Sequence, residues 1–583
     1  MSTGHGRLAL CALCLLLIVH AARAAAPQVN VEIRGLSGEP LRNALASLSI
    51  QTYHDAPNLT PSLVERLNAR AADEIHKALE PYGYYAAHVS STLTETPGGW
   101  LAHYEVAPGE PVRIRHIDIS FSGEGRDADI FAQFMAALPL HSGDQLNQPA
   151  YQRVKQQLQE LAAHHGYIDA HFTTSVLRVD PPQHWADIEL QLDTGTRYYF
   201  GAVTFVQDFM RSSFLNRYVR FKPGDAYDAS LLLNLQYALN DSGYFNSVDV
   251  LVQKKQADAA HRIPIRITLT PRKRNRYSVG LGYGTDTGPR TTLVWENRRL
   301  NGLGHRFGAQ LQYSHVLETA EINYSVPLAN PSWQQLRYSL GNSRQVLGDG
   351  VAYTTRFGIN RNDALGAWAE NQYLNLEHDR SELATSSLAS TLLVPGITFS
   401  RSVSDNPAYP TRGYRAALDL RGASAALGSD SSFLQLHLTS KLIVSLGTDT
   451  RLLLRGEVGA TVVSDFDTLP LSQRFFTGGD QSVRGYAYNS IGPRDSSGNV
   501  LGGKDILVGS LELDQRLGRI FGVAAFVDAG NVTNSFQSSL EKGAGVGLRW
   551  RTPVGVVRLD IAHPLKRPDL DRYRIHISIG PDL

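Results

Sequence analysis

The most informative motif of the chain is Phe475-Phe-Thr-Gly-Gly-Asp-Gln-Ser-Val-Arg-Gly-Tyr-Ala-Tyr488. It is too rich in glycine for the interior of a helix or a strand. It also lies in a turn-like region, roughly 464–504, that is far longer than an ordinary hairpin loop. Arg484 stands among aromatic residues, which favours a loop that folds inward and docks through charge and ring faces. The plain alternative is a surface loop with a stray arginine.

Around this loop, from about Arg276 onward, the chain consists of short alternating segments separated by turns. We count sixteen segments in about 309 residues, an even number, and each has the length that a tilted transmembrane strand needs. The sequence therefore predicts a 16-stranded antiparallel transmembrane β-barrel over 275–583 with the long loop folded inward. The sixteen segments are 277–284, 291–298, 305–314, 320–328, 334–342, 351–361, 367–378, 390–403, 413–422, 432–446, 450–463, 505–516, 520–530, 543–551, 556–564 and 573–580.

Alternation assigns polar residues of these segments to a wet lumen and apolar residues to lipid, because a charge at the bilayer midplane costs a few kcal/mol. Leu511 and Leu513 mark the lipid face, so Glu512 points inward, and the same count turns Asp528 inward. An unpaired charge inside a barrel is costly. We therefore predict that the Arg484 guanidinium pairs with both carboxylates. The alternative is that the two acids merely line water.

The first and last segments must meet to close the barrel. The first has small lumenal residues that give little packing and favour bending, and the last is followed by Pro581, which cannot donate a ladder hydrogen bond. We predict that this seam is the weakest pairing, that another strand can enter there, and that cysteines paired across it will crosslink. The alternative is that glycine simply relieves crowding. The residues assigned to the two sides of the seam are Ser278, Gly280 and Gly282, and His576 and Ser578.

Ahead of the barrel, the chain contains a weak repeat. Three helix-like stretches end in Gly83-Tyr84, Gly166-Tyr167 and Gly243-Tyr244, with the glycines 83 and 77 residues apart. Glycine suits the left-handed position that ends a helix, and an alternating strand follows each one. Three such coincidences predict a duplicated unit of strand, helix, helix, strand and strand. We place the three α+β units at 28–111, 112–196 and 197–273.

Composition and targeting signals limit the classes of protein to which the chain can belong. Residues 1–24 have the basic start, the apolar run and the small residues of a secretory signal peptide, and they contain the only cysteines, Cys11 and Cys14. The expected mature chain is therefore exported without disulfides. A mean hydropathy of −0.21 is compatible with a β-barrel. A net charge of +1 gives no argument for binding nucleic acid.

The loop and several other stretches resemble one family. Val483-Arg-Gly-Tyr486 resembles the Val-Arg-Gly-Tyr/Phe motif in the long sixth loop of outer-membrane assembly and secretion barrels that carry POTRA domains. Residues 405–414 resemble the Asp…Pro-Thr-Arg-Gly turn of these barrels, 543–565 resemble their penultimate hairpin, and the three repeats resemble POTRA domains, the first being the most divergent. The resemblance implies a loop lock that consists of Arg484, Gly485, Tyr486, Glu512 and Asp528.

The resemblance also implies a location and a function. The expected location is the outer membrane of a Gram-negative bacterium, with the POTRA domains in the periplasm. Three units and about 580 residues are similar to the TamA type of barrel, which implies insertion or export of outer-membrane β-barrel proteins such as autotransporters. The implied partners are a TamB-type inner-membrane protein, unfolded clients and outer-membrane lipid. The alternative is a two-partner-secretion pore that exports one large exoprotein.

We also weighed an enzyme and a passive porin. The sequence has no Gly-x-Ser-x-Gly, no His-Glu-x-x-His and no phosphate-binding Gly-Lys-Ser/Thr. We therefore expect no enzyme activity, no catalytic residue, no metal and no cofactor, and we interpret the pair His164-His165 as a solvated helix end. A porin would not need the repeats. The divergent first unit, 28–110, is expected to bind a periplasmic partner, although plain drift would explain the divergence nearly as well.

Overall fold

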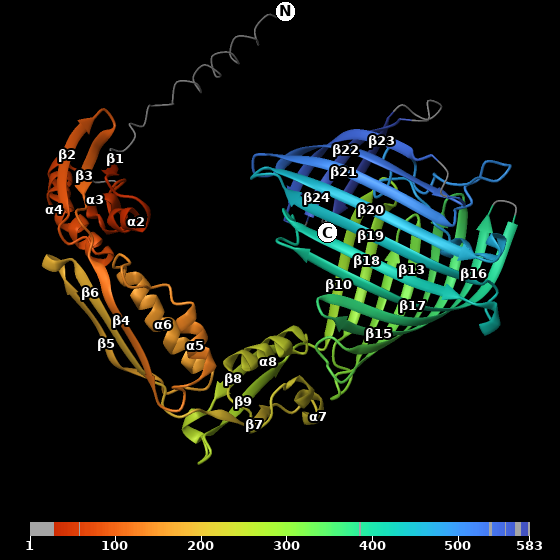
Figure 1. Cartoon of the computed structure of the whole chain (residues 1–583). Coiled ribbons are helices and arrows are strands. Elements are labelled where there is room, and N and C mark those ends of the chain that lie inside the picture. The colour runs from red at the N-terminus through yellow and green to blue at the C-terminus, as the bar shows by residue number, and fades with distance from the viewer. Residues whose placement is uncertain are drawn as a thin grey trace, which may run out of the picture. The chain divides into compact units, whose positions relative to one another are not determined.

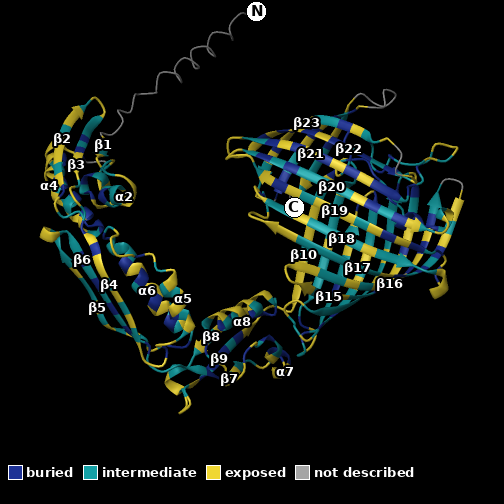
Figure 2. Cartoon of the chain, in the orientation of Figure 1, coloured by how far each residue is buried: buried dark blue, intermediate teal, exposed yellow. Residues whose placement is uncertain are grey.

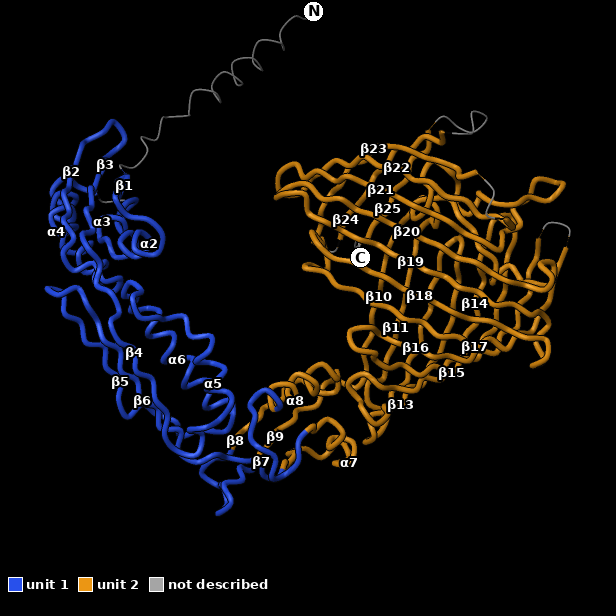
Figure 3. The backbone as a smooth tube through the Cα atoms, viewed as in Figure 1, with its two compact units in different colours: residues 1–202, 221–231, 253–264 blue, residues 203–220, 232–252, 265–583 orange. Residues whose placement is uncertain are grey.

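The computed structural model describes residues 28–56, 59–383, 386–535, 539–553, 555–565 and 573–580. Three small sheets with their helices precede a closed barrel of sixteen strands (Figure 1). The predicted fold class is therefore confirmed, whereas the predicted signal peptide and both cysteines lie outside the described residues. Residues 1–202, 221–231 and 253–264 form one compact unit, and 203–220, 232–252 and 265–583 form the other (Figure 3).

The first sheet has the strand order β1-β3-β2, with β1 parallel to β3 and β2 antiparallel to it. Helix α4 begins with Pro61 at its first position, and the Thr60 hydroxyl accepts a hydrogen bond from the Leu63 N–H, as an N-terminal cap should. Its buried residues recur at helical spacing and pack in one core with residues of β3. The elements are β1 (Gln28–Arg34), α2 (Gly38–Ser47), α3 (Ser49–Thr52), α4 (Pro61–Leu79), η1 (Glu80–Tyr82), β2 (His88–Thr96) and β3 (Gly99–Ala107).

The second and third sheets repeat this order, as β4-β6-β5 and β7-β9-β8. Gly83, Gly166 and Gly243 have φ values of +84°, +95° and +73°, which confirms the left-handed position expected at each helix end. The domain limits themselves stay predictions. The elements are β4 (Arg113–Ser122), α5 (Asp129–Ala136), α6 (Gln148–His164), β5 (His171–Asp180), η2 (Pro181–Gln183), β6 (Trp185–Asp193), β7 (Tyr199–Val206), α7 (Ser212–Leu215), η3 (Asn216–Tyr218), α8 (Ala229–Asp241), β8 (Phe245–Val252), η4 (Lys254–Gln256) and β9 (Arg262–Pro271).

The barrel is antiparallel throughout, and each predicted segment corresponds to one of its strands. Along the strands, exposed residues alternate with more buried ones (Figure 2). No helix in the described ranges is long and apolar enough to span a membrane. The strands are β10 (Asn275–Gly284), β11 (Gly288–Asn297), β12 (Arg306–Tyr313), β13 (Leu317–Pro327), β14 (Gln335–Leu347), β15 (Gly350–Leu365), β16 (Trp368–Leu383), β17 (Ser386–Ser404), β18 (Gly413–Ala423), β19 (Phe433–Ser445), β20 (Thr450–Val463), β21 (Asp505–Leu517), β22 (Phe521–Thr533), β23 (Glu541–Thr552), β24 (Gly555–Pro564) and β25 (Arg574–Gly580).

Several strands are longer than their sequence pattern suggested. Strand β16 continues to Leu383, whereas the predicted segment ended at residue 378, and β17 begins at Ser386 instead of 390. The β16 extension is mostly polar, yet each residue from Arg380 to Leu383 has a register partner on β17. The strand pairing therefore continues beyond the point where apolar alternation stops, which is why hydropathy placed the ends too early.

Candidate functional site: an inward-folded loop beside the barrel seam

The loop between β20 and β21 folds into the barrel and packs on its wall. It contains two short 3₁₀ turns, η6 (Phe466–Thr468) and η7 (Leu471–Gln473), and it contributes four residues to a small buried core. Gly485 has a φ of +95°, and a Cβ there would come 3.1 Å from the His563 carbonyl carbon. Glycine is therefore required at this position. The core contains Phe475, Val483, Tyr486 and Ile491 from the loop and Ile506, Val508 and Val532 from the wall.

Arg484 is the most heavily bonded residue of the loop. Its side chain is 3% exposed, and Nε and Nη2 donate to the two oxygens of Asp528 at 2.7 and 3.0 Å. Nη1 donates to Glu512 Oε2 at 2.7 Å and to Asp560 Oδ2 at 3.0 Å, and Nη2 also reaches Ser510 Oγ at 3.4 Å. These bonds use all five donors of the guanidinium. Arg484 therefore joins strands β21, β22 and β24 through one side chain.

A second arginine balances the charge of this cluster. Arg549 on β23 is 1% exposed and donates to Glu512 Oε1 at 2.7 Å and Asp560 Oδ1 at 2.5 Å. Arg455 lies 3.6 Å from Asp528 Oδ1. The three carboxylates therefore face three guanidinium groups, which is the condition under which buried charges are tolerated.

The predicted loop-lock residues all lie in this region. Glu512 and Asp528 both contact Arg484, the Gly485 N–H donates to His576 Nε2 at 2.9 Å, and the Tyr486 hydroxyl donates to Glu541 at 2.9 Å. Their role as a lock stays a prediction. The ring beneath the guanidinium carbon, 3.3 Å away, belongs to Phe526 of the wall, although the sequence had drawn attention to aromatic residues of the loop itself.

Sequence reasoning missed Asp560 and Arg549. The alternation of β24 places Arg558 and Asp560 on the wet face, and that pattern was the available signal for Asp560. It could not show that residues 76 apart in sequence share one contact, as Arg484 and Asp560 do. Arg549 had a comparable signal, because Val546, Leu548 and Trp550 alternate with Gly547, Arg549 and Arg551, but this pattern could not show which carboxylates Arg549 meets.

Among the described residues, one register pair joins β10 and β25, Gly284 with Ser578, and beside it the Thr285 N–H donates to the Ile577 carbonyl at 3.0 Å. By contrast, β10 is paired with β11 over its whole length, from Asn275 to Gly284. Strand β25 is paired with β24 from Arg574 to Gly580. Strand β10 is therefore hydrogen-bonded mainly to β11, and β25 mainly to β24, while few hydrogen bonds join β10 to β25.

The register corrects one expectation about the seam. Because Gly284 faces Ser578 in an antiparallel pair, Gly282 falls opposite Gly580, and no described residue lies opposite Ser278 or Gly280. The expected crosslinks from Ser278 or Gly280 to His576 or Ser578 are therefore wrong. The sequence suggested that segment 277–284 pairs end to end with segment 573–580, but β10 is shifted by several residues along β25 relative to that pairing. Alternation in a sequence predicts which face of the sheet a residue lies on, but it does not predict such a shift.

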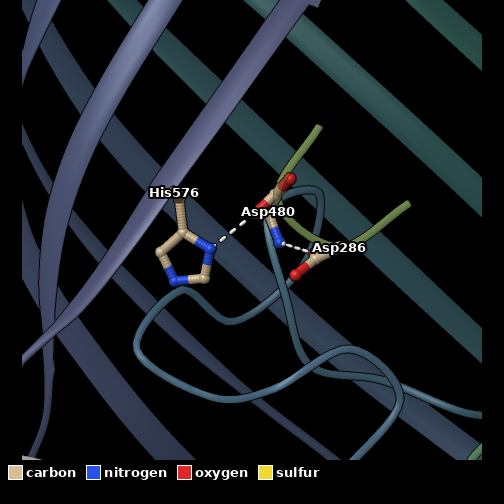
Figure 4. A group of neighbouring side chains, drawn as sticks. All are labelled: Asp286, Asp480 and His576. Atoms are coloured by element: carbon tan, nitrogen blue, oxygen red, sulfur yellow. Dashed lines mark hydrogen bonds and ion pairs between the residues drawn. The ribbon is translucent and has the colours of Figure 1, made fainter. Parts of the chain in front are cut away.

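Instead of facing β10, His576 is bound to the loop (Figure 4). Its Nδ1 lies 2.5 Å from Asp480 Oδ1, and the Thr285 hydroxyl donates to the same oxygen at 3.0 Å. The Asp480 N–H donates to Asp286 Oδ2 at 2.5 Å. We call these four residues, Thr285, Asp286, Asp480 and His576, the seam tether, because they connect β25 through the loop to the turn that follows β10.

Within the described ranges, Asp286, Asp480 and His576 are the one group whose ligand atoms lie close enough together to hold a metal ion, within 4.8 Å of one another. The hydrogen bonds argue against that use. His576 Nε2 accepts the Gly485 N–H, so a neutral ring carries its proton on Nδ1 and donates it to Asp480. Nδ1 then offers no lone pair to a cation. The arrangement serves to hold three chain segments together.

A sixteen-stranded barrel, a long loop fixed to its inner wall by an arginine, and three small α+β sheets define the class of POTRA-bearing barrels. The chain belongs to the Omp85 superfamily, because the model of the Omp85 superfamily domain matches residues 273–582. The model described as "POTRA domain TamA domain 1" matches residues 30–108. A third model, described as "Surface antigen variable number repeat", matches residues 198–272.

Individual relatives are similar at low identity. Outer membrane protein assembly factor BamA of Nitratidesulfovibrio vulgaris is 23% identical over 511 residues, which cover 83% of this chain and 63% of that protein. BamA of Neisseria meningitidis is 21% identical over 465 residues, 68% of this chain and 58% of that protein. The chain thus spans less than two thirds of the length of these relatives. A solved structure of Haemophilus ducreyi BamA lacking POTRA domains 1–3 has 17% identity and a TM-score of 0.68, and the match covers 80% of this chain and 99% of that one.

Proposed function

We propose that the protein is an outer-membrane barrel that helps insert or export outer-membrane β-barrel proteins, such as autotransporters, with its POTRA domains in the periplasm of a Gram-negative bacterium. The observation that carries this proposal is the seam, where one register pair joins β10 and β25 in the part of the chain that the structure describes. An unpaired strand edge recruits another strand through its backbone N–H and C=O groups. A client strand would supply the pairing that the seam lacks.

The mechanism needs no cofactor or nucleotide, and we propose that the protein is not an enzyme. A client gains free energy when its strands pair and its apolar residues enter the lipid. The barrel lowers the kinetic barrier to insertion of the client by offering it a temporary strand edge at the seam. The Arg484 cluster meanwhile keeps the neighbouring strands of the wall, β21 to β24, in place. Outward-facing Tyr277, Val279 and Leu281 of β10 are 74%, 69% and 81% exposed, so this edge presents an apolar surface to lipid.

The finer proposal is a TamA-type protein that works with a TamB-type inner-membrane partner. It is supported by the three α+β sheets and by the match of a TamA-specific model to residues 30–108. We propose that the first unit contacts this partner. Deleting residues 28–110 should abolish co-purification of the TamB-type protein from membranes while leaving the barrel heat-modifiable, and an unchanged yield of the partner would refute the assignment.

Reconstitution tests the function itself. Liposomes that contain the full chain should accelerate the folding of an unfolded autotransporter barrel, measured by its shift in electrophoretic mobility without heating. Liposomes that contain a porin of similar size provide the control. Equal folding rates in the two preparations would refute the proposal. Transport of a soluble exoprotein into the liposomes, with no effect on barrel folding, would instead support a two-partner-secretion pore.

A further inference from the structure

The chain between β9 and the first residues of β10 is strongly basic. Four of the five residues from 272 to 276 are cations, and all four are exposed. Within the described ranges none of them forms an ion pair, and the one side-chain hydrogen bond among them runs from Arg276 Nε to Ser278 Oγ at 3.2 Å. We call these four residues the basic root of β10: Arg272, Lys273, Arg274 and Arg276.

The turn between β11 and β12 adds two arginines to this region. Arg299 is 8% exposed, and its guanidinium carbon lies 4.3 Å from the centre of the Phe209 ring. Its buried Nη1 has no hydrogen-bond partner among the described residues. The Nε of Arg298 lies 3.8 Å from a carboxylate oxygen of Glu296. One turn arginine thus has a distant counter-charge, and the other has a buried N–H group that nothing in the described chain accepts.

The six cations lie close enough together to repel one another. Burial and the nearby charge of Arg274 lower the pKa of Arg299. Burial likewise lowers the pKa of Arg298, and the charges of Arg272 and Arg276 lower it further, against the effect of Glu296. A depressed arginine pKa means that the surroundings disfavour the charged form. An anion bound among these side chains would remove that penalty.

The carboxylates near the two turn arginines do not cancel the excess of positive charge. Glu296 is shared, because it also pairs with Arg306 at 3.3 Å. Asp208 acts on Arg299 from a distance, and it is exposed and forms no ion pair within the described ranges. The region therefore presents several guanidinium groups that can donate to the oxygens of one anion.

Aromatic residues mark the depth of the basic root relative to the lipid-facing surface. Tyr277 of β10 is 74% exposed and is the register partner of Trp295 on β11. Trp295 in turn packs edge-on against Phe307 of β12, with the ring centres 5.8 Å apart. In membrane barrels, aromatic residues gather where the apolar band meets the headgroups. The cations therefore begin where the apolar band ends.

Strand β10 offers an apolar surface directly beside these cations. Val279 and Leu281 are 69% and 81% exposed, and most of the strand is exposed (Figure 2). In the part of the chain that the structure describes, its register pairing with β25 is limited to Gly284, at the other end of the strand. A molecule with an anionic head and an apolar tail matches both surfaces. An acidic peptide or free phosphate would match only the cations.

We propose that the basic root and the two turn arginines bind the phosphate group of an anionic phospholipid whose acyl chains lie along β10. Clusters of lysine and arginine beside a membrane span attract anionic headgroups, and long cationic side chains reach the headgroup layer while their stems stay on apolar surface. This inference rests on the proposed function only in placing the barrel in a membrane. The bound lipid would cover the unpaired edge of β10 until another strand replaces it.

The test measures which lipid gathers at this place on the full chain, reconstituted in phosphatidylcholine vesicles. A fluorescent donor is attached to Leu300→Cys in the β11–β12 turn, in a chain without Cys11 and Cys14. Trace amounts of phosphatidylglycerol or phosphatidylcholine carry the same acceptor dye on one acyl chain. Energy transfer should show phosphatidylglycerol enriched at least about fivefold over phosphatidylcholine, the factor that one basic residue near a membrane surface supplies.

A second donor position controls for the general composition of the membrane. Leu365→Cys lies at the end of β15, beside the β15–β16 turn, which the antiparallel order puts at the same end of the barrel as the β11–β12 turn. The two leucines are similarly exposed, at 48% for Leu300 and 60% for Leu365. A donor at Leu365 should see both labelled lipids equally.

A charge-matched pair of variants tests the residues. Glutamine in place of Arg272, Lys273 and Arg274 should reduce the enrichment at Leu300 to less than about twofold, because one basic residue supplies about fivefold. Lysine in place of Arg272 and Arg274 keeps the charge and should keep most of the enrichment. The control removes the same charge from exposed positions of α4 in the first unit and should change nothing: Arg66→Gln, Arg70→Gln and Lys77→Gln.

Heat-modifiability establishes that each variant is folded, and salt provides a test that needs no variant. Added sodium chloride screens the interaction and should lower the enrichment around the wild-type chain. Enrichment that does not change with salt would overturn the phosphate site. An equal loss in the α4 control and in the variant of the basic root would also overturn it, since total charge would then explain the effect.

The remaining outcomes separate this site from the proposed function. A folded chain that floats with the vesicles but shows equal transfer from both lipids at Leu300 would overturn the lipid site alone. A folded chain that does not float with vesicles would contradict the membrane location on which the proposed function depends. Loss of the enrichment in inorganic phosphate, but not in sodium chloride of the same ionic strength, would assign the cations to free phosphate and overturn the proposal.

Discussion

The loop contacts the barrel wall in several places, including β16, where the Leu471 N–H donates to Ser381 Oγ. Two of these contacts, one at β21 to β24 and one at the seam, differ in strength. At the wall formed by β21 to β24, Arg484 and Arg549 make charge-assisted bonds to three buried carboxylates. At the seam, the loop holds β25 through one His576–Asp480 contact and one backbone bond from Gly485. The His576–Asp480 bond also has a carboxylate acceptor and is charge-assisted, so the difference lies in number, because Arg484 alone makes four such bonds to the wall. The loop is thus anchored firmly on one side and tethered weakly on the other.

This difference identifies the strand pair whose separation would break the fewest bonds. The bonds of Arg484 join the loop to β21, β22 and β24, so a movement that separates β10 from β25 does not have to break them. Across the seam only Gly284 and Ser578 are paired among the described residues, and the seam tether supplies the few other bonds. Under the proposed function, a client strand would have to replace only a small number of hydrogen bonds at the seam, whereas entry at any other strand pair would require the loss of a full ladder.

The largest expected effect is the loss of the lock. Arg484→Ala leaves Asp528 with Arg455 as its remaining ion-pair partner and removes one cation from Glu512 and Asp560, so it should cost about 3–5 kcal/mol. Urea unfolding, monitored by heat-modifiability and by client folding, measures the loss. Arg494→Ala is the control within the same loop, because Arg494 is exposed and donates to the carbonyls of Gly498 and Ser490. Unchanged stability and activity of Arg484→Ala would remove the lock from the mechanism.

The second prediction concerns the seam itself. Cysteines introduced in place of Gly284 and Ser578 should crosslink, because residues that face each other in an antiparallel pair lie about 4.5–5.5 Å apart at Cα, within disulfide reach. The crosslinked barrel should lose client folding completely, and a reductant should restore it. Neither cysteine of the chain, Cys11 or Cys14, lies in the barrel.

A second crosslink, placed away from the seam, distinguishes the effect of closing the seam from the effect of stiffening the barrel with any disulfide. Asn342 and Thr355 face each other in the long β14–β15 pairing, and Asn342 Nδ2 donates to Thr355 Oγ1 at 2.9 Å. Cysteines at these two positions should crosslink without any effect on client folding. Full activity with the seam completely crosslinked would show that the seam does not have to open.

The third prediction weakens the tether without touching the lock. His576→Ala removes the acceptor of the buried Gly485 N–H and the partner of Asp480, at an expected cost of about 1–3 kcal/mol. His576→Gln can replace both bonds and should recover most of the loss. The rate of disulfide formation in the seam variant, with cysteines in place of Gly284 and Ser578, reports on closure and should fall when His576→Ala is added. An unchanged rate would mean that the loop does not help to close the seam.

The sequence predicted the architecture because each signal was local. Alternation within single strands indicated all sixteen strands and turned Glu512 and Asp528 inward, and three glycines marked the helix ends of the repeated units. Sequence reasoning failed where the answer depends on register between distant strands. It could not place Gly284 opposite Ser578, and it did not bring Asp480 together with Thr285, because the turn after β10 and the loop are 195 residues apart.

The smallest effect that we predict comes from Thr285, which belongs to the tether but is exposed. Its hydroxyl donates to Asp480 Oδ1 at 3.0 Å and accepts the Ile577 N–H at 3.1 Å, so it bonds to the loop and to β25 at once. Thr285→Val keeps the shape and removes both bonds. Water can reach the exposed site and replace part of them, so the expected cost is about 0.5–1.5 kcal/mol. Thr285→Ser retains the hydroxyl and is the control.

Disulfide formation across the seam, measured in the same double-cysteine variant, should slow less with Thr285→Val than with His576→Ala. An effect of Thr285→Val as large as that of His576→Ala would show that the turn after β10, and not the buried histidine, dominates the closure.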